Sequence, residues 1–251
     1  MTACGGGGST AARGPHTAVT TGATRSTTPS TASRHAPTAL TKRQAMTFAD
    51  AVNLTAADTP GLTAAAPEHE HDTATEKRLE REAGHCAGVL SANEKLIEAS
   101  SKHFKRGHGI PEASVSSEVA VARTAQLAAR ELAAIHSERA RTCLSHYLGQ
   151  LFRGKEFRGA RISPISIASG TPPAAGATGS FAWRVKVTIT AQRLTIPFWI
   201  DILGFVYGPA QVSLFSYGVP APFPAAIQQR LFLLLLERAK AHRSALSVAH
   251  G

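Results

Sequence analysis

The chain has 251 residues, of which 43% are hydrophobic, and its 27 Lys and Arg against 17 Asp and Glu give a formal net charge of +10. This composition excludes a wholly disordered chain, and the length allows one domain of ordinary size with a tail. A membrane-spanning helix needs about 18 consecutive apolar residues. The longest apolar run, Leu231–Leu236, is far shorter, so we expect no spanning helix.

The first residues, Met1-Thr2-Ala3-Cys4, resemble the end of a bacterial lipoprotein signal peptide. In that motif an aliphatic residue and two small residues precede the cysteine that receives a lipid. Met1 stands where Leu or Val is usual, and the charged and apolar segments of a full signal are absent from the recorded sequence. Both departures are explained if the true start lies upstream. We therefore expect a lipid on Cys4 and an extracytoplasmic protein anchored to the outer face of the cell membrane; the alternative is a cytosolic protein.

Residues 1–45 are rich in Gly, Ser, Thr, Ala and Pro, and they bury too little apolar surface to offset the entropy of ordering. We interpret this tail as a flexible tether. It is basic, because residues 1–47 contain no acid, and its cations are Arg13, Arg25, Arg34, Lys42 and Arg43. Such a tail can contact anionic lipid or an anionic cell-wall polymer. It lacks interleaved aromatic residues, so no specific nucleic-acid partner is expected.

A single domain is expected over residues 46–243, followed by a disordered C-terminus over residues 244–251. Its first half begins with an apolar segment around Phe48, a turn at Pro60-Gly61 and an extended segment over Leu62–His71. Asp72 or Thr73 is the expected N-cap of a helix. Ser100–Gly109 is polar and basic, which favours a loop.

The second half reads as a strand, two helices and a β block. Val115, Val119 and Val121 indicate the strand, and Thr124 and Ser137 are the expected caps of the two helices. The β block begins near Ile162. Three regions then alternate apolar and polar residues: from Phe181, from Leu194 beyond the turn Gln192-Arg193, and over Gln211–Tyr217 beyond the turn Gly208-Pro209.

A helix follows Pro224, with one apolar face formed by Ile227, Leu231, Leu234 and Leu235. The order of elements predicts an α+β fold, in which helices pack on an antiparallel sheet and a C-terminal helix closes the core.

Three cysteines divide into Cys4 in the tail and a pair, Cys86 and Cys143, in the domain. Each member of the pair lies on the apolar face of its own expected helix. If both helices bury that face on the same side of the sheet, the Cα atoms can approach to about 4.4–6.8 Å, as a disulfide requires. In an oxidising compartment we expect this bond to form; the alternative is two separate buried thiols.

Candidate sites are few. His69 and His71, within Glu68–Asp72, are a possible zinc or copper pair on an extended segment, although acids before a helix are also a common solvated cap. His103 and His108 flank a basic pair that could hold an anion. Asp201 lies in an apolar strand, either facing solvent beside Trp199 or partly buried with a raised pKa.

No hydrolase elbow, phosphate-binding glycine loop or dinucleotide fingerprint is present. We therefore expect no catalytic residues and no cofactor, and we favour a non-catalytic, lipid-anchored binding or sensor module. Two alternatives stay open. One is a metal-dependent enzyme or metal-binding protein using His69 and His71, and the other is a cytosolic nucleic-acid-associated protein using the basic tail.

The segment Asn53–Gly61 (Asn-Leu-Thr-Ala-Ala-Asp-Thr-Pro-Gly) is similar to the Leu-x-x-x-Asp-Leu-Pro-Gly opening of extracytoplasmic sensor domains and small lipoproteins of high-GC Gram-positive bacteria. Thr59 stands where that family has Leu. The resemblance covers residues 46–243 in layout and includes the sensor domains outside membrane serine/threonine kinases. It implies helices on an antiparallel sheet, and it provides no shared catalytic residues.

Overall fold

The computed structural model describes residues 39–65, 74–107, 110–153 and 159–246. The chain divides into residues 1–36 and a unit of residues 37–251. Everything below concerns the described part of the second unit. None of the helices there has both the length and the apolar composition that crossing a membrane requires.

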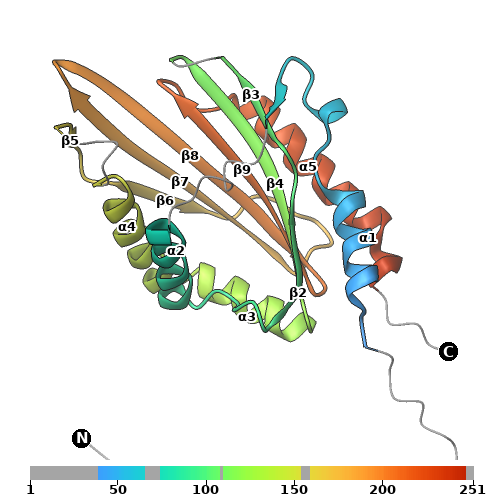
Figure 1. Cartoon of the computed structure of the whole chain (residues 1–251). Helices are drawn as coiled ribbons and strands as arrows, with labels where there is room; N and C mark the ends of the chain where they lie inside the picture. Colours follow the sequence, from blue (N-terminus) through green and yellow to red (C-terminus); the bar gives the residue numbers. More distant parts are fainter. Residues whose placement is uncertain (1–38, 66–73, 108–109, 154–158, 247–251) are drawn as a thin grey trace, which may run out of the picture. The chain divides into compact units, whose positions relative to one another are not determined.

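A nine-stranded antiparallel sheet is the centre of the fold (Figure 1). Its order is β1-β3-β4-β9-β8-β7-β5; in addition β2 pairs with β4 and β6 pairs with β7. The bounds are β1 Thr63–Ala65, β2 Lys95–Ser100, β3 His103–Arg106, β4 Glu112–Ala122, β5 Arg161–Ile162, β6 Ser166–Gly170, β7 Gly179–Ala191, β8 Leu194–Tyr207 and β9 Ala210–Val219. The predicted α+β class with its antiparallel sheet is confirmed.

The long hairpins form where the alternation of apolar and polar residues predicts them. In β7, Phe181, Val185 and Val187 are buried on one face, and β8 pairs with this strand over its whole length. Gln192 and Arg193 connect the two strands with positive φ angles of 49° and 70°, which matches the twist of a two-residue hairpin turn.

One face of the sheet packs against α1 (Lys42–Val52) and α5 (Ala225–Ala241). The apolar sides of both helices meet valines and phenylalanines of β4, β8 and β9, and Phe205 makes an edge-to-face contact with Phe232. A capping box between Thr41 and Gln44 begins α1. The domain therefore starts earlier than the predicted residue 46, because this cap and the buried Ala45 already belong to it.

The opposite face packs against α3 (Ala125–Ile135) and α4 (Glu138–Leu151), on the side of the sheet away from α1 and α5 (Figure 1). Thr124 and Ser137 cap these helices, as predicted, by accepting hydrogen bonds from backbone N–H groups. Gly204 leaves room for the ring of Phe181 on the facing strand, which a Cβ would overlap. The helix α2 (Ala74–Ala87) packs against α4.

Two further predictions from sequence are wrong, one of a loop and one of the C-terminal end of the domain. Ser100–Gly109 is not a loop, because β2 ends at Ser100 and His103–Arg106 form β3, with Phe104 buried in the core. A four-residue strand with three basic residues has too little alternation to be recognised. The C-terminal boundary at 243 is also too early, because η4 (Arg243–Leu246) packs Ala245 and Leu246 against the core.

Candidate functional site

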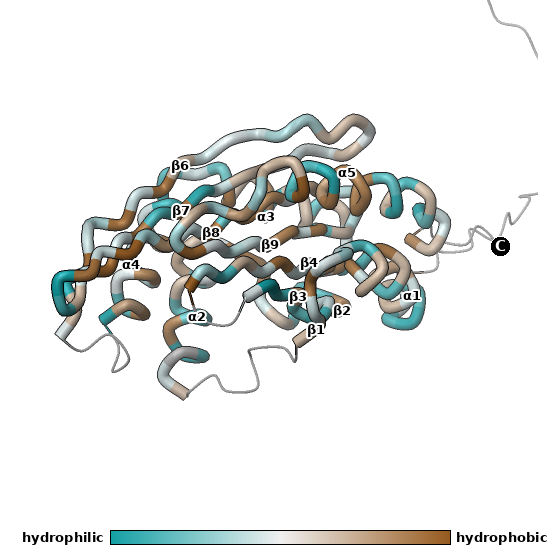
Figure 2. The backbone as a smooth tube through the Cα atoms, turned by 90° about the horizontal axis from the view of Figure 1, so that it is seen from above, coloured by the Kyte–Doolittle hydropathy of each residue, from teal (hydrophilic) through white to brown (hydrophobic). Residues whose placement is uncertain are grey.

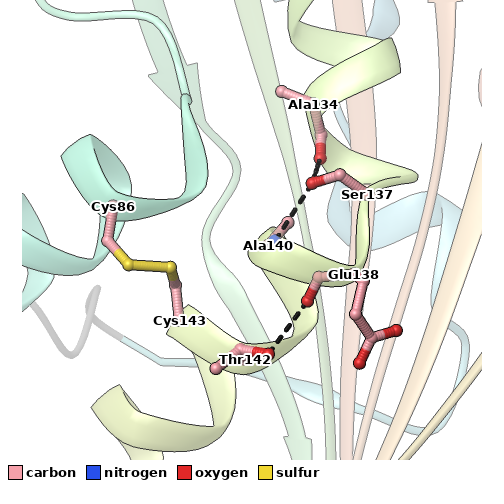
Figure 3. Close-up of a disulfide and its surroundings, with 7 residues drawn as sticks. All are labelled: Cys86, Ala134, Ser137, Glu138, Ala140, Thr142 and Cys143. Carbon is pink, nitrogen blue, oxygen red and sulfur yellow. Dashed lines mark hydrogen bonds between the residues drawn. A yellow bond between two sulfur atoms is a disulfide. The ribbon is translucent and has the colours of Figure 1, made fainter.

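Cys86 of α2 and Cys143 of α4 form a disulfide, with their Cα atoms 5.8 Å apart (Figure 3). The predicted pair is confirmed. The geometry that brings the two together differs from the expectation in one respect: α2 lies on α4 and not on the sheet. Cys143 is buried on α4, so the bond fastens an outer helix to an inner one.

The segment around the disulfide is held at both ends. Ser137, before α4, accepts a hydrogen bond from Ala140 N and donates one to Ala134 O at the end of α3 (Figure 3). After α2, Leu90 N donates to the buried carboxylate of Glu131 on α3 at 3.0 Å. Burial raises the pKa of Glu131, although this hydrogen bond partly opposes the change.

The segment Asn53–Gly61, on which the family resemblance rests, has a structural role. Asp58 lies at the end of η1 (Ala56–Asp58) and accepts two hydrogen bonds from the guanidinium of Arg238 on α5, at 2.7 and 2.8 Å. Arg238 also donates to Asn53 O. Burial by itself would raise the pKa of Asp58, but the hydrogen bonds from Arg238 and Thr55 outweigh it and hold the pKa below its usual value.

Asp201 is buried and ion-paired. Its carboxylate accepts two hydrogen bonds from Arg184 of the neighbouring strand, at 2.6 and 3.1 Å. Asp201 lies on the same face of β8 as Trp199, as expected, but its side chain is buried and does not face solvent. The Asp201 hydrogen bond raises the pKa of Arg184, so the pair is a fixed cross-strand ion pair.

The remaining predicted ligands are not assembled into a site. Cys4, His69, His71 and His108 lie outside the described residues. His103 lies in β3 and lines the pocket described next, but the structure does not describe its predicted partner His108. Among the residues that the structure describes, no group of three or more His, Cys, Asp or Glu is placed to hold a metal ion.

A candidate site for a small ligand is a pocket of about 330 Å³ on the face of the sheet that packs against α3 and α4. Strands alone line it. Register places Ser114 of β4 opposite Tyr217 of β9, which in turn lies opposite Ile200 of β8. Ser116 lies opposite Phe215 in the next row. Two hydroxyls therefore stand beside two aromatic rings, and we call this the sheet-face pocket; its lining residues are His103, Glu112, Ser114, Ser116, Ile200, Phe215, Ser216 and Tyr217.

The two serines are the notable polar groups of the sheet-face pocket. Ser114 and Ser116 are only 8% and 7% exposed, and no side-chain hydrogen bond joins either hydroxyl to another described residue. At one rim, Glu112 forms an ion pair with Lys105 at 3.9 Å. The pocket thus offers hydrogen bonds, a flat apolar wall and a charged rim, which is the composition of a small-molecule site.

Sequence reasoning missed this pocket, although a signal was present. In β4, Glu112, Ser114, Ser116 and Glu118 alternate with the valines that predict the strand. A strand that covers a closed core on both faces would carry apolar residues at both parities. The serines therefore marked a polar face, but only the register shows that aromatic side chains of β9 stand beside them.

No family model and no curated protein matches the chain. Among solved structures, it is similar to a protein of unknown function from Pseudomonas aeruginosa, PA94. The two are 12% identical in sequence over 62% of this chain and 85% of the other, with a TM-score of 0.19. This likeness is too weak to carry an argument about function.

Proposed function

We propose that the protein is a non-catalytic, lipid-anchored binding or sensor module outside the cytoplasmic membrane. The observation that carries this proposal is the Cys86–Cys143 disulfide. Stable disulfides form in oxidising compartments and are rare in the reducing cytosol. Cys4, within Thr2-Ala3-Cys4, supplies the lipid site that the sequence resemblance implies, and the residues after it supply the tether.

The anchoring step has a defined chemistry. The sulfur of the Cys4 thiol attacks the glycerol carbon that carries the head-group phosphate of a membrane phospholipid. The carbon–oxygen bond to the phosphate breaks, a thioether to the diacylglycerol forms, and the thiol proton goes to the phosphate ester that leaves. Hydrolysis of the Ala3–Cys4 peptide bond then makes Cys4 the new N-terminus. A single acyl chain binds a membrane only marginally, whereas two or more chains anchor stably. The basic residues of the tail add attraction to anionic lipid or cell-wall polymer.

Detergent phase partitioning tests the anchor in cells that express the protein from its own locus with the upstream sequence included. We expect the protein in the membrane fraction and in the detergent phase, and the Cys4→Ala variant in the aqueous phase. Cys86→Ser is the matched control, since it removes a cysteine that carries no lipid. Equal partitioning of the parent protein and Cys4→Ala would refute the anchor.

The sheet-face pocket is the proposed ligand site of the module. The hydroxyls of Ser114 and Ser116 and the ring of Phe215 fit a small, neutral ligand with hydroxyl groups and one apolar face. Thermal-shift measurements with a panel of soluble sugars and polyols test this pocket. A binding ligand raises the Tm of the parent protein, and Ser116→Val, which keeps the shape but removes a hydroxyl, should abolish the rise. A rise that survives Ser116→Val would place the ligand elsewhere.

A further inference from the structure

The outer edge of the sheet is formed by β6, whose outward main-chain groups pair with no other strand that the structure describes. Ser163 N donates to Thr188 O of β7 at 2.9 Å, so the even-numbered residues of β7 bond toward this edge. Ser166, Ala168 and Gly170 lie opposite even-numbered residues. The alternation of an antiparallel ladder then turns the N–H and C=O groups of Ile167 and Ser169 away from β7.

The edge strand lacks the features that usually protect such an edge. Its sequence, Ser-Ile-Ala-Ser-Gly, contains no charge and no proline, which are common devices against strand pairing. Within the described residues β6 pairs with β7 alone, and Figure 2 shows it at the margin of the sheet. Five residues span about 17 Å, which is enough for a short added strand.

A groove runs beside this edge, between β6 and α4. It consists of two cavities of about 500 and 260 Å³. Both are lined by Glu138 and Arg141, so the cavities adjoin. The strand side is formed by Ile165 and Ile167 and farther along by Ser169. On the helix side Gly149 faces open space, since a Cβ at this position would meet no atom within 4 Å.

The basic residues that line the groove indicate which kind of segment it binds. Arg141 and Arg153 line it together with His146, and its acid, Glu138, is ion-paired with Arg141. An acidic segment would complement these groups. The chain's own first 47 residues carry cations and no acid, so they are a poor match. A second copy of the chain pairing edge to edge would bring its own arginines against these.

We propose that the α4–β6 groove binds an extended, acidic segment of a partner protein, which adds to the sheet as a strand beside β6. The main chain of the segment bonds to Ile167 and Ser169. Every second side chain of an added strand points to the α4 side, where carboxylates meet Arg141 and Arg153. This is the strand-addition mode of peptide recognition. It is independent of the sheet-face pocket and of the lipid anchor.

The probe for this proposal is a fluorescein-labelled peptide in which Asp or Glu alternates with Val, and the measurement is fluorescence anisotropy with the full chain. We expect saturable binding, and a weaker affinity for the matching peptide with Lys in place of the acids. Ser169→Pro removes an outward N–H without touching the bonds to β7, so affinity should fall about tenfold, whereas Ser169→Ala should change it less than about twofold. Gly149→Trp should also fill the groove and prevent binding.

Gly84→Trp on α2 is the matched control, because it makes the same exchange in a helix outside the groove. A probe N-methylated along one edge serves as a second test that does not depend on the folding of any variant, and it should not bind. No saturable binding of the acidic probe, equal binding of the N-methylated or the lysine probe, or full binding to Gly149→Trp would overturn the proposal. Hydrogen exchange at Ile167 and Ser169 should slow when the acidic probe binds.

Discussion

At the scale of single residues, the ion pair of Asp58 and Arg238 joins η1, which follows α1, to the C-terminal helix α5. The carboxylate is almost fully buried, and the guanidinium is about a quarter exposed. Two hydrogen bonds between charged groups fix both side chains, and Arg230 adds a bond to Asp58 O. The pair therefore joins parts of the chain that lie at opposite ends of the domain sequence.

The Asp58–Arg238 ion pair should make the stability of the folded protein fall at acidic pH. The pKa of Asp58 is lower in the folded state than in the unfolded chain, so its contribution is fully present above the unfolded pKa, about 4. The contribution is lost as the pH falls through the folded pKa. Urea unfolding between neutral and acidic pH should show a decline in stability that is smaller in Asp58→Asn. An unchanged decline in this variant would assign the acid sensitivity to other groups.

Removal of the cation alone should be more damaging. Arg238→Ala leaves a buried carboxylate without its partner, so we expect a loss of about 2 kcal/mol in the free energy of unfolding at neutral pH. Because the cost arises from the unpaired charge, Asp58→Asn in the same chain should recover part of it. A double variant no more stable than Arg238→Ala would contradict the coupling.

Thr59 directly follows Asp58 and is 1% exposed. Its hydroxyl has no hydrogen-bond partner among the described residues. Thr59→Val keeps the shape and removes the unsatisfied group, so we expect a gain of about 1 kcal/mol in the free energy of unfolding. Thermal unfolding measures it. A lower Tm for Thr59→Val than for the parent would show that the hydroxyl has a partner outside the described residues.

At the scale of elements, α2 depends on its disulfide more than the other helices do. It packs against α4, whereas α1, α3 and α5 contact strands directly. The crosslink joins residues 57 apart in the sequence, and on the chain-entropy model such a bond stabilises the fold by about 4 kcal/mol. Reduction should therefore loosen α2 before it affects the sheet.

Hydrogen exchange followed by mass spectrometry measures this order. With a reductant, or in Cys86→Ser/Cys143→Ser, amides of Ala74–Ala87 should exchange much faster, while those of β8 and β9 keep their protection. Cys4→Ser is the control and should behave as the parent chain does. Loss of protection in the sheet at the same time as in α2 would show that the helix is an integral part of the core.

The elements also show which features of the fold can be predicted from sequence. Long strands with strict alternation, such as β7, and helices with a clear cap, such as the one after Ser137, were predicted because local pattern and burial agree. β2 and β3 were missed because each is short, with six and four residues, so that neither shows a clear alternation of apolar and polar side chains. The pairing of Cys86 with Cys143 was predictable from their helical faces, whereas the packing of α2 on α4 depends on contacts between distant parts of the chain.

At the scale of the whole molecule, the candidate sites were less predictable than the fold. The aromatic residues beside Ser114 and Ser116 belong to β9, which lies about 100 residues later in the chain. The α4–β6 groove likewise needs an edge strand and a helix whose positions only the complete topology defines. The basic tail and the residues Thr2-Ala3-Cys4, which predict a lipid on Cys4, are local in sequence and need no fold to be recognised.

Intact-mass spectrometry is the most direct test of the lipid-anchored, extracytoplasmic assignment. The sample is protein recovered from membranes of cells that express it from its own locus. We predict a mature chain that begins at Cys4, carries the added mass of a diacylglycerol thioether and contains no free thiol, because Cys86 and Cys143 are joined. A chain that keeps the residues before Cys4, with all three thiols free, would contradict the account.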